Sequence, residues 1–317
     1  MINREILDTV FRGLKADFNG KLKIAGEDKS ADEIATTVPS STASERFDWF
    51  GQLPDARKWV GARKINQLTN FKYEVFHDYY EVTLAVKRED ILDNTLGGYK
   101  LQALTGAEAM SYLKPKLICQ ALNSGKSNLC YDGQNFFSTD HPVGNDGDET
   151  AVPNLFDNGG TQATHPWYML DVSRAVKPIL FVEREKPQFQ SFQSMQDWHA
   201  FMTREFIFGA HARYGSGYGL WQFAARNEGA LCYNTAKTCY DAMSDYRGDE
   251  LDEDGRRKKM GVNPSVIVCG QSNYLAARAL VEHPYLQSKT DPLEIGSSNT
   301  PNPFFGLFKV VKLSWLP

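Results

Sequence analysis

The stretch of residues 60–91 constrains the fold of this chain more than any other part of its 317-residue sequence. Apolar or aromatic residues alternate with polar ones over 71–75 and again over 82–86, and a period of two is typical of half-buried strands. We expect the chain to reverse at His77–Asp78, in a loose connection, because neither residue is the glycine that a tight two-residue turn favours. The pattern therefore predicts a two-stranded ribbon.

A ribbon with arms of ~8 residues would reach roughly 25 Å, and an isolated two-stranded ribbon is only marginally stable in water. It must therefore lie on another surface. Either the two strands belong to an ordinary sheet of the same chain, or the ribbon is an extended arm that rests on another copy of the protein. In the second case, the side chains expected to contact the neighbouring copy are Phe71, Tyr73, Val75, His77, Tyr79, Val82 and Leu84.

The composition is that of a folded chain with one large domain or two ordinary ones. Hydrophobic residues make up 42% of the sequence and aromatic residues 12%, which suffices for a packed core and argues against disorder. The formal net charge of −4 supplies no basic field for nucleic acid or anionic lipid. No apolar run approaches the ~20 residues of a membrane span. Residues 1–15 lack the apolar core of a signal peptide, so we expect a soluble protein made in the cytoplasm.

Cysteine and histidine usage predicts free thiols and no metal site. The five cysteines are an odd number without CxxC spacing, which fits a reducing compartment better than a disulfide framework. The six histidines are scattered without an HxxxH motif, so a structural zinc ion is not expected. Residues 250–255 resemble the start of an EF-hand loop, but Gly261 stands where that loop requires a bidentate glutamate. We expect no metal ion and no cofactor.

A long helix is predicted from about Tyr99 to Leu122, because apolar residues recur there at spacings of three and four. It would span roughly 35 Å, and Pro115 should kink it or split it in two. An amphipathic helix is also predicted over residues 2–14, followed by a polar arm. The apolar residues that define the long helix are Leu101, Leu104, Met110, Leu113 and Leu117.

The rest of the chain mixes short strands and helices without a regular βαβ repeat, which indicates an α+β fold. Residues 128–164 are rich in glycine, asparagine, aspartate and proline and are predicted to form surface loops. Residues 245–262 carry acids followed by bases and are predicted to form a solvated hairpin. The predicted strands are Trp167–Leu170, Pro178–Glu183, Phe201–Ala212, Tyr218–Ala224, Ser265–Cys269 and Gly306–Leu313, and the predicted helices are Thr235–Tyr246 and Asn273–Glu282, the second capped by Ser272.

One set of residues could support catalysis. Cys130, Asp140 and His141 could supply a thiol nucleophile, an orienting carboxylate and a base, which would make the protein a cysteine hydrolase. This chemistry requires the base within hydrogen-bond reach of the sulfur, and sequence separation does not set that distance. No family signature surrounds the cysteine, so we expect no enzymatic activity and keep the hydrolase as an alternative of another class.

Several long segments resemble the major head subunit of Mu-like phages and prophages, the gene T product family. The similarity runs in order over nearly the whole chain and includes rare Trp, Cys and His residues at matching places. The segments that carry it are EIATTVPSSTASERFDWFGQLPDARKWVGAR (33–63), KREDILDNTLGGY (87–99), CYDGQNFFSTDHPV (130–143), WYMLDVSRAVKPILFVERE (167–185), FMTREFIFGAHARYGSGYGLWQ (201–222) and GVNPSVIVCGQSNYLAARAL (261–280).

This resemblance implies a Hong Kong 97-type capsid fold, with an N-terminal arm, an extended β-hairpin loop, a peripheral domain with a long spine helix, and an axial domain at the capsomer centre. Carried onto this sequence, it implies an arm at 1–45, the extended loop and its base at 46–98, and the peripheral domain with the spine helix at 99–129. Residues 130–317 would form the axial domain plus peripheral strands. Within them, we expect 167–222 to be peripheral, in a permuted order.

The resemblance also implies a function, that of a major capsid protein which self-assembles through hexamers and pentamers into an icosahedral phage head around double-stranded DNA. The expected partners are further copies of the chain, portal, scaffold or protease and decoration proteins, and packaged DNA bound without sequence specificity; no membrane partner is expected. The expected location is the virion, after synthesis in the bacterial host cytoplasm. The alternative with the same fold is the shell of a cellular compartment that encloses an enzyme.

Overall fold

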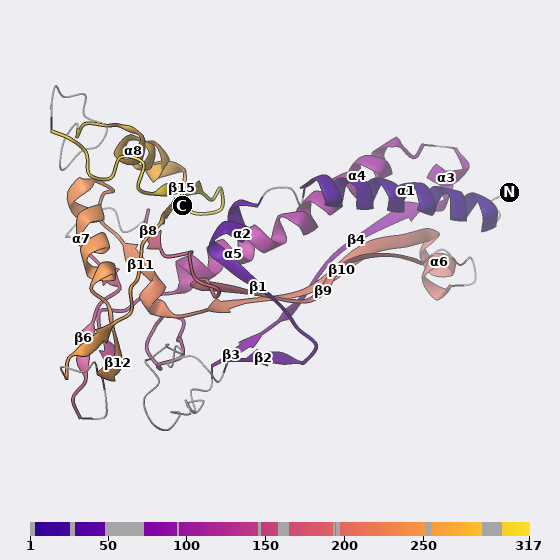
Figure 1. The fold of residues 1–317 in the computed structure, drawn as a ribbon. Coiled ribbons are helices and arrows are strands. Elements are labelled where there is room, and N and C mark those ends of the chain that lie inside the picture. Colours follow the sequence, from indigo (N-terminus) through magenta and orange to yellow (C-terminus); the bar gives the residue numbers. More distant parts are fainter. Residues whose placement is uncertain are drawn as a thin grey trace.

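Two lobes, each built on its own sheet, make up the chain (Figure 1). The structure, a computed structural model, describes residues 4–25, 29–47, 73–93, 95–144, 147–157, 165–192, 194, 197–251, 255–286 and 300–317. One lobe is long and thin and contains a four-stranded sheet; we call it the long-sheet lobe. The other contains a five-stranded sheet and is called the five-strand lobe. The chain begins at the far end of the long-sheet lobe and ends in the five-strand lobe.

The four-stranded sheet is dominated by two long strands. β9 (Ile179–Phe192) and β10 (Glu205–Tyr218) each contain 14 residues and run antiparallel. β4 (Asp78–Lys87) pairs antiparallel with β10, and β1 (Ala35–Pro39) pairs parallel with β9, which gives the order β1-β9-β10-β4. The short helix α6 (Trp198–Thr203) lies between β9 and β10 at the far end of the lobe.

Helices cover one side of this sheet (Figure 1). The first is α1 (Arg4–Ala25), which covers residues 4–14 of the predicted helix and continues for three more turns; residues 2 and 3 of the prediction lie outside the described residues. Its buried side chains follow helical spacing and pack against α4, β4 and β10 in a separate core cluster at the far end. The members of this cluster are Leu7, Phe11, Leu14, Val86, Ile91, Ala103, Phe206 and Phe208.

The predicted long helix is present as two helices, α4 (Gly97–Ser111) and α5 (Leu113–Ser124), separated at Tyr112. Pro115 is the third residue of α5. The first turn of a helix is the place where backbone N–H groups lack an intrahelical partner, so a proline there costs no hydrogen bond. The predicted split is confirmed, and it lies just before the proline because Pro115 belongs to the first turn of the new helix.

The five-strand lobe is built from short strands that are buried on both faces. β8 (Trp167–Leu170), β11 (Ala224–Asn227) and β14 (Val266–Cys269) have only buried residues, the pattern expected for strands covered on both sides. β15 (Lys309–Lys312) and β7 (Leu155–Phe156) complete the order β15-β14-β8-β11-β7. Helices α7 (Tyr233–Ser244) and α8 (Gln271–Glu282) pack against β11 and against β14 and β15, respectively.

In this half of the chain, one predicted strand is confirmed with its bounds, one predicted hairpin is confirmed, and one predicted cap is wrong. β8 has the predicted bounds, and the predicted hairpin over 245–262 contains the antiparallel pair β12 and β13. Helix α8 begins two residues earlier than predicted, so that Gly270 and not Ser272 occupies the N-cap. The remaining elements are α2 (Ser30–Ile34), β2 (Ser44–Arg46), β3 (Glu74–Phe76), α3 (Arg88–Leu92), β5 (His141–Val143), β6 (Thr150–Val152), η1 (Trp221–Phe223), β12 (Arg247–Leu251) and β13 (Arg257–Lys259).

The predicted reversal at His77–Asp78 is wrong. β3 pairs with β2, β4 pairs with β10, and only His77 separates β3 from β4. The reason lies in β10, where a Cβ atom at Gly215 would come 2.2 Å from the Phe76 carbonyl oxygen. Glycine at this position lets the backbone around His77 lie directly against β10. β3 and β4 therefore do not fold back on each other, and each pairs with a strand from elsewhere in the chain.

The predicted strands at 201–212 and 218–224 are also wrong as separate elements. The chain over 205–218 is the single strand β10, residues 198–203 are the helix α6, and residues 221–223 form the 3-10 helix η1. The glycines between the predicted strands, Gly215 and Gly217, lie within β10 where β3 approaches closely; a Cβ at Gly217 would come 2.4 Å from Val75 Cγ2. Glycine here marks close backbone approach and not a strand end.

Candidate assembly surfaces

Several side chains predicted to contact a neighbouring copy lie against their own chain. Val75 is 3% exposed, and its Cγ2 fills the space where a Cβ at Gly217 would stand. Val82 and Leu84 are half-buried and face Gly106 of α4. The apolar alternation is therefore satisfied within the subunit, as in the ordinary-sheet alternative. Contact between these residues and a neighbouring copy stays a prediction.

Tyr73 and His77 are interior positions of the same stretch. The Tyr73 hydroxyl accepts a hydrogen bond from the Tyr218 N–H at 2.8 Å, and burial raises the pKa of that hydroxyl. His77 is 6% exposed, and its Nε2 lies 3.2 Å from Ser40 Oγ. Burial is the main cause that lowers the pKa of His77, and the positive charges of Arg213 and Arg184 lower it further. Both residues connect elements of the subunit.

Tyr79 is the accessible residue of the predicted set, with 67% of its surface exposed. Its hydroxyl accepts a hydrogen bond from Arg213 Nη1 at 3.0 Å, and the guanidinium lies 4.6 Å from the ring centroid. Phe76, which is not among the predicted contact residues, is 68% exposed. Phe71 lies outside the described residues. Among the residues described, an accessible contact in this stretch would involve Phe76 and Tyr79.

The residues that defined the long helix lie on both of its faces. Met110 and Leu117 are 5% and 6% exposed and belong to the main core. Leu104 and Leu113 are half-buried, whereas Leu101 is 65% exposed on the outer side of α4. Apolar spacing in the sequence therefore identified the helix but did not separate core positions from an exposed one.

A buried ion pair connects α5 to the five-strand sheet. Arg226 of β11 donates from Nε to Glu228 at 3.1 Å, and its Nη1 donates to the Asn123 carbonyl at 3.0 Å, in the last turn of α5. Lys126 Nζ lies 2.9 Å from the same carboxylate. The C-terminal carbonyls of a helix lack intrahelical partners and carry partial negative charge. The guanidinium therefore satisfies the end of α5 and fixes it to the second lobe.

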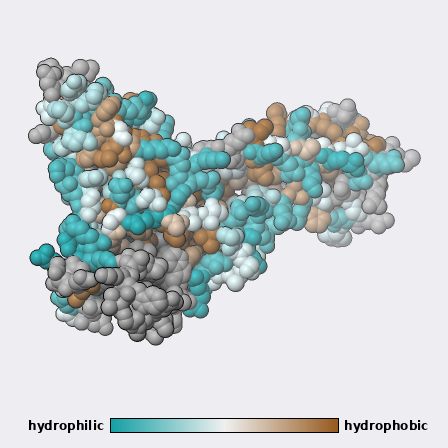
Figure 2. Space-filling model, in the orientation of Figure 1, coloured by the Kyte–Doolittle hydropathy of each residue, from teal (hydrophilic) through white to brown (hydrophobic). Residues whose placement is uncertain are grey.

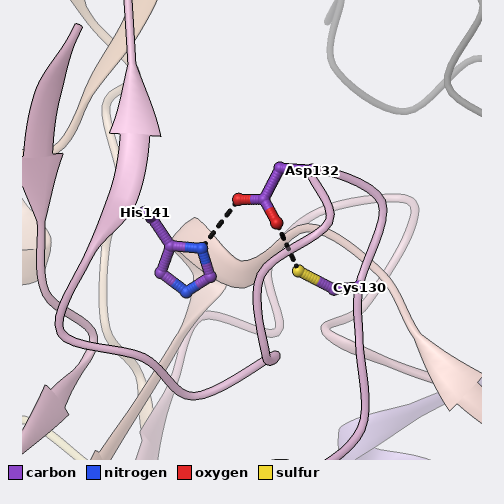
Figure 3. A group of neighbouring side chains, drawn as sticks. All are labelled: Cys130, Asp132 and His141. Carbon is purple, nitrogen blue, oxygen red and sulfur yellow. Dashed lines mark hydrogen bonds and ion pairs between the residues drawn. The ribbon is translucent and has the colours of Figure 1, made fainter.

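A polar cluster is buried where the sequence suggested a catalytic set (Figure 3). The Asp132 carboxylate lies between the two other side chains: one oxygen is 2.7 Å from His141 Nδ1, and the other accepts from Cys130 Sγ at 3.0 Å. His141 Nε2 lies 3.2 Å from Asn154 Oδ1, and its ring stacks on Trp221 at 4.0 Å. The carboxylate is thus Asp132, not the predicted Asp140.

The geometry of this cluster fits a structural cross-link. Burial strongly raises the pKa of the Cys130 thiol, so the thiolate that a nucleophile requires is disfavoured. Burial also opposes ionisation of Asp132, but the hydrogen bonds from His141 and Cys130 outweigh it and lower the pKa of the carboxyl. Ligand-type atoms of the three residues lie within 4.8 Å of one another, a grouping that sequence spacing did not predict. The two oxygens of the Asp132 carboxylate accept hydrogen bonds from His141 and Cys130. The arrangement therefore supports a hydrogen-bonded cross-link.

Large apolar side chains are exposed at the far end of the long-sheet lobe. We call this group the tip patch and define it as Phe192, Trp198, Phe201 and Met202. Other exposed apolar residues gather over the helical side of the same lobe and near α8 (Figure 2). The tip patch does not follow from the sequence pattern, which places Phe201 in a predicted strand. The run WHAFMT, without Asp, Glu, Lys or Arg, was the available signal.

Comparison with solved structures identifies the class of fold. A chain of the bacteriophage JBD30 procapsid has a TM-score of 0.77 and 33% identity, over 99% of this chain and 100% of that chain. A chain of the JBD30 capsid has a TM-score of 0.70 at 24% identity, over 92% and 94% of the two chains. The chain is therefore a phage capsid subunit with the α+β Hong Kong 97-type fold. Its two lobes, with the long strands β9 and β10 and the helices α4 and α5, are consistent with this class.

The particular family follows from sequence comparison. The model of the Mu-like prophage major head subunit gpT matches residues 7–316. The major capsid protein of Escherichia phage Mu is 36% identical over 258 residues, which cover 80% of this chain and 82% of that protein. The Mu-like prophage FluMu major head subunit of Haemophilus influenzae is 32% identical over 285 residues, covering 89% and 90%. The chain belongs to the family of Mu-like prophage major head subunits and is a major capsid protein.

This family membership supports the phage head over the two alternatives, the cellular compartment shell and the cysteine hydrolase. The sequence predicts no membrane partner, because it contains no apolar run long enough to span a bilayer. Of the described helices, none combines the length and the apolar composition needed to cross a bilayer.

Proposed function

We propose that this major capsid protein assembles through hexamers and pentamers into an icosahedral head that encloses double-stranded DNA. The observation that carries the proposal is the end-to-end similarity to a subunit of the JBD30 procapsid, with both chains covered almost completely. Shape and surface support it, because an elongated subunit with exposed apolar groups is suited to association with many copies. The net charge of −4 suits a shell that holds packaged DNA loosely.

The domain names follow from the same proposal. We assign the peripheral domain to the long-sheet lobe, the spine helix to α4 and α5, and the axial domain to the five-strand lobe. The segment 167–222 would then contribute to both domains, because β8 lies in the five-stranded sheet whereas β9 and β10 form the long sheet. The N-terminal arm would include α1, which packs along α4.

The partners of the shell are proposed by analogy. The JBD30 capsid is decorated with trimers of a minor capsid protein, and we infer a comparable decoration protein for this chain. A portal and a scaffold or protease complete the expected set, with the virion as the location. Catalysis has no part in this function; Cys130 and His141 act in the subunit as a hydrogen-bonded cross-link.

Electron microscopy of the purified chain tests the assembly. We expect rings and closed hollow shells in negative stain, because many weak contacts are strengthened when they close on a symmetric particle. A matched sample held in mild denaturant below the unfolding transition should contain fewer shells and more free subunits. A preparation that remains monomeric at every concentration and salt tested would contradict the proposal.

A further inference from the structure

The buried cluster of Cys130, Asp132 and His141 has the donor set of a zinc site (Figure 3). It offers a thiol sulfur, a carboxylate and an imidazole nitrogen, and these ligand atoms lie within 4.8 Å of one another. Sulfur, nitrogen and oxygen donors together favour zinc, whereas calcium and magnesium prefer oxygen alone. His141 is fully buried, and the side chain of Asp132 is only 7% exposed. The cluster is therefore largely shielded from water.

The hydrogen bonds around His141 determine which of its ring nitrogens faces the cluster as a ligand. The Asn154 amide is oriented by the backbone: its Oδ1 accepts from the Ser138 N–H at 2.9 Å, and its Nδ2 donates to the Phe136 carbonyl at 2.8 Å. The same Oδ1 lies 3.2 Å from His141 Nε2, so this nitrogen carries a proton. Histidines that bind a metal donate their second N–H in this way. Nδ1 is then the nitrogen that faces Asp132, at 2.7 Å.

The contact between His141 Nδ1 and the Asp132 carboxylate requires a cation between the two atoms. Each carries a lone pair, and at 2.7 Å they would repel each other unless a proton or a metal ion lies between them. A proton gives the hydrogen-bonded cross-link. A zinc ion would take the place of that proton and also bind the Cys130 sulfur, so the thiol proton and the proton shared by His141 and Asp132 would both leave to solvent. Thiolate and carboxylate would balance the two positive charges of the ion.

The ligands are held in position by hydrogen bonds and stacking within the subunit. Cys130 and Asp132 lie in one tight turn, in which the Cys130 N–H donates to the Gln134 carbonyl at 2.8 Å. The Gln134 N–H in turn donates to Asp132 Oδ1 at 3.0 Å. The His141 ring stacks on Trp221 at 4.0 Å, with 6° between the ring planes. Ligand atoms around zinc lie about 3–4 Å apart, so the contacts of the cluster need to open by only about 0.5 Å.

We propose that Cys130, Asp132 and His141 are the protein ligands of a zinc ion, which replaces the hydrogen bonds of the cross-link and ties the turn after α5 to β5. Sequence spacing does not predict this site, because the turn and the strand are brought together only by the fold. An ion that binds the folded chain alone stabilises it, so the role of the zinc ion is structural. The inference goes beyond the proposed assembly and does not depend on it.

Cobalt binding tests the ligand assignment. Co²⁺ occupies zinc sites, and it gives an intense near-ultraviolet band when a thiolate is among its ligands. The purified full chain, stripped with a chelator and dialysed, should bind one Co²⁺ per subunit with this band, and Zn²⁺ should remove the band. Cys130→Ser keeps a hydroxyl that can donate to Asp132, so it should fold, as circular dichroism would show. It should nevertheless lose the band and at least tenfold in affinity.

The matched control is Asp140→Asn, which removes a carboxylate next to His141 in sequence but outside the cluster. This variant should bind Co²⁺ as the unchanged chain does. An unchanged chain without the thiolate band would overturn the inference, and so would a Cys130→Ser variant that retains the band.

Thermal unfolding provides a second readout. Zn²⁺ should raise the unfolding temperature of the stripped unchanged chain and of Asp140→Asn, whereas the same concentration of Mg²⁺ should not. Cys130→Ser should show no rise with Zn²⁺. A rise of equal size in Cys130→Ser would place the ion elsewhere and refute the assignment. Neither readout depends on whether shells form, so failure of the proposed assembly and failure of the zinc site are distinguishable.

Discussion

The two lobes of this subunit use β-structure in opposite ways. In the five-strand lobe, strands of four residues such as β8 and β14 are buried on both faces, between helices and loops of the same chain. In the long-sheet lobe, strands of 14 residues alternate between a covered and an open face, and they end at the exposed tip patch. The first lobe completes its own core. The second leaves large apolar side chains uncovered at the end of its sheet, as expected of a protein that associates with other copies.

The junction between the lobes is expected to be the most sensitive point. Replacing Arg226 with alanine should lower the free energy of unfolding by about 3 kcal/mol, because the buried Glu228 carboxylate would keep only Lys126 as a partner and the end of α5 would lose a donor. Denaturant unfolding monitored by tryptophan fluorescence measures this loss. Lys237→Ala, which removes an exposed ion pair with Asp241, is the matched control and should leave the midpoint unchanged. An equal effect of both variants would contradict the role of the junction.

The glycines of the long sheet should respond differently from a glycine on the helices. Gly215→Ala places a Cβ against the Phe76 carbonyl oxygen and should cost about 1–3 kcal/mol through overpacking. Gly13→Ala, in α1 with no atom within 4 Å of the new Cβ, should stabilise the protein by about 0.5–1 kcal/mol. Thermal unfolding of the two variants measures the difference in sign. A neutral Gly215→Ala would show that β3 can move away from β10 freely.

The smallest expected effect is the pH dependence contributed by His77. Its pKa is lowered in the folded state by burial and by neighbouring arginines, so the unfolded chain binds the proton more readily. The stability contribution is therefore complete above the ordinary histidine pKa of ~6.5 and declines as the pH falls below that value. We expect the unchanged chain to lose stability relative to His77→Gln between about pH 7 and pH 5. A difference in unfolding free energy that is independent of pH would contradict this assignment.

Prediction from sequence succeeded where one segment carries its own signal. The amphipathic spacing of α1, the split of the long helix at Pro115 and the strand Trp167–Leu170 depend on residues close together in the chain. The α+β class also follows from the mixture of such segments. These features were accessible because helix and strand periods are properties of a local stretch.

Prediction from sequence failed where contacts with a distant segment of the chain decide the structure. The alternation over 71–86 indicated strands with one covered face, and the described residues 74–76 and 78–87 are strands. The pattern does not state what covers that face, and β10 and α4 do so here. The same holds for Asp132, which joins Cys130 and His141 although Asp140 is adjacent to the histidine in sequence. Hydrogen bonds of this kind depend on how loops are brought together by the core around them.

The sequence by itself determined the family, the long helices and the buried strands β8 and β14, because these depend on residue identity and on local periodicity. Only the tertiary structure decided which strands pair, where the buried polar groups meet and which apolar side chains remain exposed at the tip. The physical reason is that burial and pairing are relations between segments far apart in the chain. A sequence pattern records that a face avoids water, whereas the fold determines which surface covers it or whether the subunit leaves it open.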